Sequence, residues 1–213
     1  MKIAIFQLAL FAVNCFVVYD EAEKKAAIVD PGIINDEEAE AIGNFLKKHE
    51  LEVTQIINTH LHIDHAIGNT RLKEKYGVEV AAHADDEFLG KRLANQAREF
   101  NLPFEVKDAG VTKHLKDGDE IRIGSGVLQV IHVPGHSPGG IALYDKEDGW
   151  LIAGDSLFEG SIGRTDLPGG NMATLLKAIK EKLFTLPDST VVFCGHGPST
   201  TIGDEKQYNP FFR

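Results

Sequence analysis

The stretch that decides the fold lies at residues 59–65 and reads Thr59-His60-Leu61-His62-Ile63-Asp64-His65. It follows Thr54–Asn58, a short run of β-favouring residues, so we expect the histidines in the loop at the carboxyl end of a strand. In an extended turn, alternate side chains point the same way, so His60 and His62 can hold one metal ion while Asp64 and His65 turn toward a second. The stretch therefore predicts a metal centre.

Three further motifs also follow predicted strands. These strands span Val127–Val133, Trp150–Ala153 and Val191–Cys194, and the motifs after them are Pro134-Gly135-His136, Gly154-Asp155 and Gly195-His196-Gly197. Neutral imidazole and carboxylate are ligands that zinc, iron and manganese accept. A single histidine after a strand is usually a hydrogen-bonded polar residue without a metal, but this many ligand-type residues after strand ends favour the metal centre.

Composition and charge limit the class of partner. The chain has 213 residues, 43% of them hydrophobic and 25% charged, which is typical of a globular protein. The formal net charge of -10 argues against nucleic-acid binding, which relies on clustered Lys and Arg. A small-molecule substrate is therefore expected.

The apolar start of the chain could pass for a signal peptide, because Lys2 precedes it and Ala12 is small, but we interpret it as two strands. Gln7 and Asn14 interrupt Ile3–Val18, which lacks a cleavage pattern and is too short to cross a bilayer. The only cysteines, Cys15 and Cys194, are too few for a disulfide framework, so a reduced, cytoplasmic setting is expected. Cys194 is expected to be a buried, unreactive thiol.

The order of predicted elements favours one domain over residues 1–213, in the α/β (α+β) class. We predict strands at Ile3–Leu8, Cys15–Tyr19, Ala26–Asp30, Thr54–Asn58, Val78–Ala82, Val127–Val133, Gly139–Tyr144, Trp150–Ala153 and Val191–Cys194, with a strand pair flanking Lys116–Asp119. Helices are predicted from Asn35 or Asp36 to His49, over Ala66–Tyr76, between Asp85 and Glu99, and from Asn171 to Leu186. Helices can then cover the outer faces of two packed sheets.

With these motifs in place, the chain resembles the metallo-β-lactamase superfamily over essentially its whole length. The resemblance implies a four-layer αβ/βα sandwich with the site at the sheet edge. It also implies that His60, His62 and His136 hold one metal ion, that Asp64, His65 and His196 hold a second, and that Asp155 bridges them. Asp155 differs from the cysteine ligand of zinc β-lactamases, which argues against antibiotic hydrolysis.

Within the superfamily, the chain is similar to short hydroxyacylglutathione hydrolases, the glyoxalase II group. Gly154–Phe158 and Gly163-Arg164 look like the segment in which a Lys binds the glutathione carboxylate, and Arg164 stands in its place. A guanidinium can hold a carboxylate through two hydrogen bonds. Thr165-Asp166 replaces the usual aromatic pair, and the chain ends 17 residues after His196 without the helical C-terminal domain of that group.

These resemblances imply a metal-dependent thioester hydrolase. A hydroxide shared by two metal ions would attack the carbonyl of an S-lactoylglutathione-like thioester, with Asp64 as catalytic residue orienting it and Arg164 binding substrate. Zinc is the expected metal, with iron or manganese as alternatives. Gly163–Asp166 also resembles persulfide dioxygenases, which would use one iron held by His60, His136 and Asp155. The acyl group, the thiol, the number of metal ions and the oligomeric state stay open.

Overall fold

Two six-stranded sheets form the centre of the computed structural model, which describes residues 1–103 and 105–213. The first sheet has the strands, in spatial order, β1 (Lys2–Gln7), β2 (Asn14–Asp20), β3 (Lys25–Val29), β4 (Glu52–Ile57), β5 (Glu79–His83) and β6 (Lys113–Leu115). The second has β14 (Thr200–Thr201), β13 (Val191–Cys194), β10 (Trp150–Gly154), β9 (Ile141–Asp145), β8 (Gly126–His132) and β7 (Glu120–Ile123). A short hairpin, β11 (Leu157–Phe158) with β12 (Ser161–Ile162), stands apart.

Alternation along β2 shows how the layers are built. Phe16 and Val18 pack between the two sheets, whereas Cys15 and Val17 face the opposite way into the core beneath the helices. Successive strand residues point to opposite faces, so a strand with helices on one side and a sheet on the other is apolar throughout. All seven residues of β2 are accordingly buried.

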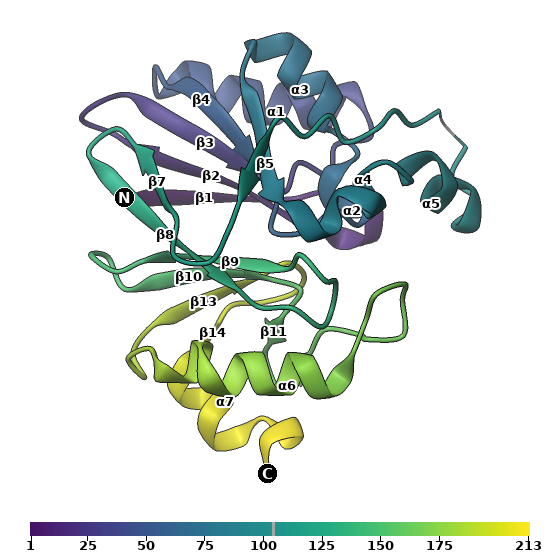
Figure 1. The fold of residues 1–213 in the computed structure, drawn as a ribbon. Coiled ribbons are helices and arrows are strands. Elements are labelled where there is room, and N and C mark those ends of the chain that lie inside the picture. Colours follow the sequence, from purple (N-terminus) through teal and green to yellow (C-terminus); the bar gives the residue numbers. More distant parts are fainter. Residues whose placement is uncertain (104) are drawn as a thin grey trace.

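Helices cover the outer face of each sheet (Figure 1). On the first sheet lie α1 (Asp36–Lys48) and α3 (Asn69–Tyr76), and on the second lie α6 (Met172–Glu181) and α7 (Ile202–Tyr208). Asn35 and Asn171 cap α1 and α6 through side-chain oxygens that accept hydrogen bonds from Glu38 N and Thr174 N, both at 2.9 Å. The predicted αβ/βα sandwich is confirmed. That residues 1–213 form a single domain stays a prediction.

The structure differs from the predicted elements at several places. The helix predicted over Ala66–Tyr76 is split into α2 (Ile63–Ala66) and α3, because Gly68 donates to Pro31 O at 2.9 Å and interrupts it. Asp64 and His65 therefore lie in a helical turn rather than an extended one.

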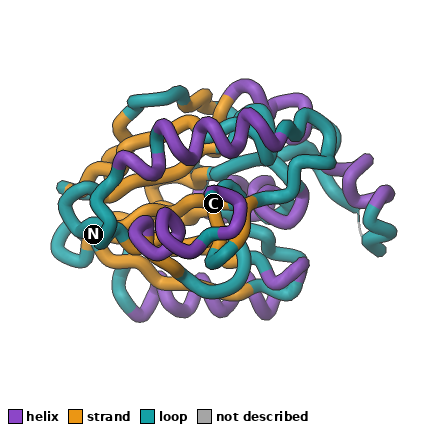
Figure 2. Tube along the Cα trace, turned by 90° about the horizontal axis from the view of Figure 1, so that it is seen from below, coloured by secondary structure: helices purple, strands orange, loops and turns teal. Residues whose placement is uncertain are grey.

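The segment between Asp85 and Glu99 also breaks, into a 3₁₀ turn (Ala84–Asp86), α4 (Glu87–Gly90) and α5 (Leu93–Glu99). Three short 3₁₀ turns, at Leu10–Ala12, Leu183–Thr185 and Pro210–Phe212, complete the elements of the described residues. The α5 segment projects from one end of the molecule (Figure 2).

The strands flanking Lys116–Asp119 do not pair with each other. β6 pairs with β5 in the first sheet, and β7 pairs with β8 in the second, so this turn carries the chain between the sheets. A short turn between two β runs usually makes a hairpin. Here each strand pairs with a different sheet instead, because the two sheets pack against each other at this turn. Within the part of the chain that the structure describes, no helix is long and apolar enough to cross a membrane.

Candidate metal centre

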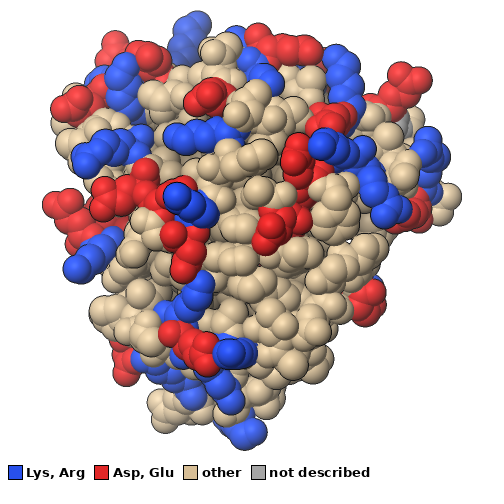
Figure 3. Space-filling view, viewed as in Figure 1, with Lys and Arg blue, Asp and Glu red and all other residues tan. Residues whose placement is uncertain are grey.

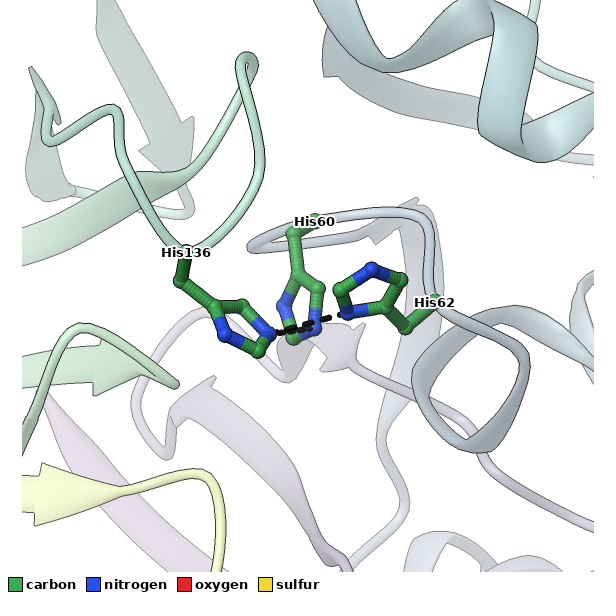
Figure 4. Close-up of side chains that lie close together, drawn as sticks. All are labelled: His60, His62 and His136. Atoms are coloured by element: carbon green, nitrogen blue, oxygen red, sulfur yellow. Dashed lines mark hydrogen bonds between the residues drawn. The ribbon is translucent and has the colours of Figure 1, made fainter. Parts of the chain in front are cut away.

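Three imidazoles from two loops meet at the edge of the sandwich. His60 and His62 follow β4, and His136 follows β8, so carboxyl ends of strands from both sheets supply them. Nε2 of His136 lies 3.2 Å from His60 Nε2 and 2.9 Å from His62 Nδ1. Figure 4 shows the three rings pointing toward one another. We call these residues the first set.

A second set forms beside the first. Asp64 and His65 come from α2, and His196 follows β13. Nε2 of His196 lies 3.1 Å from Asp64 Oδ2 and 3.3 Å from His65 Nε2, while Asp64 Oδ2 and His65 Nε2 are 3.6 Å apart. Their ligand-type atoms therefore converge on one point.

Asp155 lies between the two sets. Its Oδ2 is 3.6 Å from His136 Nε2 of the first set and 3.6 Å from His196 Nε2 of the second. Its Oδ1 is 3.4 Å from His65 Nε2, too poorly aligned for a hydrogen bond, and is buried without another partner among the residues that the structure describes. All seven side chains predicted as metal ligands are thus brought together.

The outward-facing nitrogens of four of these histidines meet oxygen atoms. Nδ1 of His136 is 2.8 Å from Arg164 O and Nδ1 of His196 is 3.0 Å from Phe11 O. His60 Nδ1 lies 3.1 Å from Thr59 Oγ1, and His65 Nδ1 lies 3.0 Å from Asp30 Oδ2 as an ion-pair contact without hydrogen-bond alignment. Such contacts fix the ring orientation and the tautomer of a metal-binding histidine. Nε2 of His62 is buried and has no partner among the described residues.

Electrostatics differ between the two sets. Burial, together with neighbouring imidazoles, lowers the pKa of His60 well below its ordinary value and that of His62 to about 3, so both rings are neutral at pH 7 with lone pairs available. Burial would also lower the pKa of His65, but Asp64, Asp155 and Asp30 together raise it well above its ordinary value. The second set therefore attracts positive charge, which a proton or a cation can supply.

This donor set fits transition-metal ions. Imidazole nitrogens about 2.0–2.1 Å from one tetrahedral ion lie roughly 3.3 Å apart, close to the separations found within each set. An unpartnered buried carboxylate oxygen on Asp155 is costly unless something binds it. Nitrogen and oxygen ligands suit zinc, iron and manganese alike, so the donor set does not choose among them.

The two sets open into a cavity of about 300 Å³. Its lining combines residues of the centre with the predicted substrate-binding Arg164 and others that the sequence did not indicate, namely Phe11, Leu89, Arg92, Gln96, Glu99, Phe100, Leu167 and Pro168. Arg92 and Glu99 lie on a predicted helix, where charges are usually solvated, and nothing in their spacing pointed to the cavity.

His83, His132 and Cys194 belong to neither ligand set. His83 and His132 stack in parallel, with ring centroids 4.1 Å apart and planes 8° apart. Since an ion bound by an imidazole lies in the ring plane, two parallel rings cannot share one ion in this arrangement. Cys194 is buried, and burial raises its pKa to about 12, which makes it the unreactive thiol that the sequence predicted.

Replacing Gly195 by Ala should disrupt the centre while sparing the fold. A Cβ at Gly195 would lie 2.1 Å from Asp155 Oδ1 and 2.9 Å from His65 Cε1, so both side chains must move. We expect metal content and turnover to fall at least about 10-fold, in line with the effect of misplacing supporting groups. Metal analysis and circular dichroism would check this, with Gly43→Ala in α1 as control, since the atom nearest to a Cβ there is the flexible Lys75 Nζ at 3.2 Å. Unchanged metal content would contradict the packing argument.

Metal binding should also raise thermal stability. Zn²⁺ added to chelator-treated protein at about 100 times its dissociation constant should stabilise the fold by about 2.7 kcal/mol. This corresponds to a rise in Tm of roughly 5–11 °C for a chain of this size. Scanning calorimetry with and without Zn²⁺ measures the shift, and His60→Ala should abolish most of it. An identical shift in that variant would place the binding elsewhere.

Comparison with protein families matches residues 8–196 to the metallo-beta-lactamase superfamily. An uncharacterized protein from Aquifex aeolicus is 40% identical over 99% of this chain and 97% of its own length. A protein named hydroxyacylglutathione hydrolase GloC, from Haemophilus influenzae, is 37% identical over 99% of this chain and 98% of its own.

Solved structures agree on the fold. A structure named BLEG-1 B3 metallo-beta-lactamase has a TM-score of 0.88 and 34% identity, covering 99% of both chains. A di-iron-bound form of TTHA1623 has a TM-score of 0.84 and 32% identity over 98% of this chain and 99% of that one. ETHE1 from Myxococcus xanthus has a TM-score of 0.81 and 26% identity over 99% of this chain and 84% of that one.

Proposed function

The chain belongs to the metallo-β-lactamase superfamily, and from this premise we propose that it is a metal-dependent hydrolase of hydroxyacylglutathione-type thioesters such as S-lactoylglutathione. The observation that carries the proposal is the convergence of seven imidazole and carboxylate side chains beside a cavity of about 300 Å³. The similarity to the protein named hydroxyacylglutathione hydrolase, which extends over nearly the whole of both chains, supports the choice of substrate class.

We assign the ligands by set. His60, His62 and His136 would hold one ion, Asp64, His65 and His196 the other, and Asp155 would contact both. Bound divalent ions supply an acidified water and polarise a carbonyl oxygen.

The chain's own residues would position the reacting groups. Asp64 lines the cavity with 12% of its side chain exposed, so its carboxylate can accept a hydrogen bond from the attacking water and orient it. Asp30 and the backbone carbonyl of Arg164 hold His65 and His136 in place while this happens. A thiolate is a good leaving group and needs no strong general acid, which suits this cavity lining.

Arg164 remains the proposed carboxylate-binding residue from the sequence motif. It lines the cavity, but its Nε and Nη2 both donate to the carboxylate of Asp166 at 2.7 Å. A substrate carboxylate bound here must therefore share the guanidinium with Asp166.

A small substrate also suits the outer surface. On the face drawn in Figure 3, Lys and Arg side chains are interspersed with Asp and Glu rather than gathered into one basic surface. A polyanion such as RNA gains affinity mainly from clustered cations. This distribution favours a small molecule over nucleic acid.

A second candidate function is iron-dependent oxidation of a persulfide. Gly163–Asp166 resembles persulfide dioxygenases, and the similarity to a di-iron-bound structure favours iron as a metal to test. His60, His136 and Asp155 would hold the single iron, and Nε2 of His136 lies within 3.6 Å of the other two side chains.

A substrate panel on the zinc, iron and manganese forms tests the proposal. We expect thioester cleavage, followed as loss of S-lactoylglutathione, to exceed all other activities. Oxygen consumption on glutathione persulfide without thioester cleavage would replace the proposal with the dioxygenase. A β-lactam belongs in the panel, because a structure named a B3 metallo-beta-lactamase matches at 34% identity although the Asp155 motif argued against that activity.

A further inference from the structure

The cavity wall contributed by α5 carries two opposite charges that the ligand sets do not use. Arg92, Gln96 and Glu99 all line the cavity. Spacings of four and three residues place successive side chains on one face of a helix, and Arg92 directly precedes α5. One helix face therefore presents a guanidinium and a carboxylate to the cavity.

This face is fixed relative to the first set. Gln96 is buried, its Oε1 accepts from Ile63 N at 3.0 Å, and its Nε2 donates to Leu61 O at 3.3 Å and Leu89 O at 3.0 Å. Leu61 and Ile63 are the backbone neighbours of His62. These hydrogen bonds hold Arg92 and Glu99 in a fixed position relative to the His62 loop, although α5 projects from the body of the molecule (Figure 2).

The two guanidinium groups of the cavity differ in availability. Asp166 holds Arg164 through two hydrogen bonds, which raise the pKa of Arg164 and lower that of Asp166 to about 2. The Nη2 of Arg92 lies 3.8 Å from Glu99 Oε1, beyond hydrogen-bond distance, and half of its side chain is exposed. The Arg92 guanidinium and the Glu99 carboxylate are therefore not hydrogen-bonded to each other, whereas those of Arg164 and Asp166 are.

We propose that Arg92 and Glu99 recognise the α-amino acid group of the substrate's thiol half, with its carboxylate at Arg92 and its ammonium at Glu99. This inference rests on the proposed thioesterase function and names the substrate feature that the cavity selects. A simple anion would gain from Arg92 but meet repulsion from Glu99, whereas a zwitterion complements both charges. The γ-glutamyl end of a glutathione conjugate carries such a group.

The apolar part of the cavity fits the remainder of such a substrate. Phe11 and Phe100 contact each other edge to face with centroids 5.2 Å apart, and both line the cavity together with Leu89. An apolar wall with a few charged groups is the usual design of a small-molecule site, in which the charges set orientation.

Three thioesters and three variants test the assignment. The substrates are S-lactoylglutathione, its analogue without the α-ammonium, and its analogue without the α-carboxylate of the γ-glutamyl residue. The variants are Arg92→Gln, Glu99→Gln and the control Lys91→Gln, which removes a charge that pairs with Glu87 at 2.9 Å on the neighbouring turn. Each combination is described by kcat and KM separately.

We expect Arg92→Gln to raise KM about 10-fold for S-lactoylglutathione, the change that about 1.4 kcal/mol of binding produces, with kcat within twofold. The same variant should leave KM for the decarboxylated analogue unchanged. Glu99→Gln should raise KM for S-lactoylglutathione but not for the desamino analogue. Equal effects on all three substrates, or effects no larger than those of Lys91→Gln, would overturn the assignment.

A binding experiment separates this inference from the proposed reaction. If the metal-loaded protein cleaves no thioester, the proposed function fails, and calorimetry with S-methylglutathione then tests the charged pair alone. Binding that weakens about 10-fold in both Arg92→Gln and Glu99→Gln supports recognition of the zwitterion. Binding that is absent, or insensitive to both substitutions, overturns it.

Discussion

Replacing Asp155 by Asn is expected to lower kcat/KM at least about 1,000-fold. Asp155 contacts residues of both sets, so its loss affects both ions, and removal of mere outer contacts already costs 10–100-fold. Burial would raise the pKa of Asp155, but His65, His136 and His196 bring it well below its ordinary value, so the carboxylate is charged. Asn has nearly the same shape without the charge, and the fold should survive.

Metal content and turnover should be measured together in Asp155→Asn. We expect the metal bound per chain to fall by about half or more, since an amide oxygen is a weaker ligand than a carboxylate. Asp188→Asn is the control, because Asp188 pairs with Lys206 on the surface. Retention of both full metal content and wild-type turnover would show that Asp155 bridges nothing.

The fold could be predicted because its strongest signals are local. β2 is apolar at most positions because it has packing on both faces, and Asn35 and Asn171 precede amphipathic helices that they cap. The position of the site followed from one general rule, that the carboxyl ends of strands meet at an edge. His60, His136 and His196 all follow strands, and the structure brings the first two rings into contact and places His196 against Asp155, which also contacts His136.

The hydrogen bonds that support the site from distant segments of the chain could not be predicted from the sequence. Phe11 accepts a hydrogen bond from His196 across 185 positions, with its backbone in the left-handed region at φ 52°. Gln96 and Arg92 reach the cavity only because α5 packs against the His62 loop. Each contact depends on how two distant segments pack, and neither spacing nor composition encodes that packing.

Among the residues that support the metal centre without lying in it, Asp86 is the one whose substitution we expect to lower stability and metal affinity most. It is fully buried, its Oδ2 accepts from Leu61 N at 3.1 Å and Ser137 Oγ at 2.7 Å, and its Oδ1 accepts from Gly139 N at 2.5 Å. Leu61 lies between two histidines of the first set and Ser137 directly follows the third. One carboxylate therefore joins the two loops that carry the first set.

Asp86→Asn should weaken both the fold and the first set. Burial raises the pKa of Asp86 and the three donors oppose that rise, and both carboxylate oxygens accept hydrogen bonds. An amide places N–H against at least one donor, which costs about 1–3 kcal/mol and lowers Tm by roughly 2–12 °C. Because the loops then separate, we expect metal affinity to fall about 10–100-fold, measured by competition with a chromophoric chelator.

Asp20→Asn is the matched control that separates positioning from stability. Asp20 accepts hydrogen bonds from Ala22 N, Glu23 N and both the N and Oγ of Ser125, far from the metal centre. Its amide should reduce Tm for the same reason as at Asp86 while leaving metal affinity within twofold. Ser137→Ala, which removes one of the three donors to Asp86, should fall between wild type and Asp86→Asn in affinity. If Asp86→Asn and Asp20→Asn lowered Tm and metal affinity alike, Asp86 would be a structural residue without a positioning role.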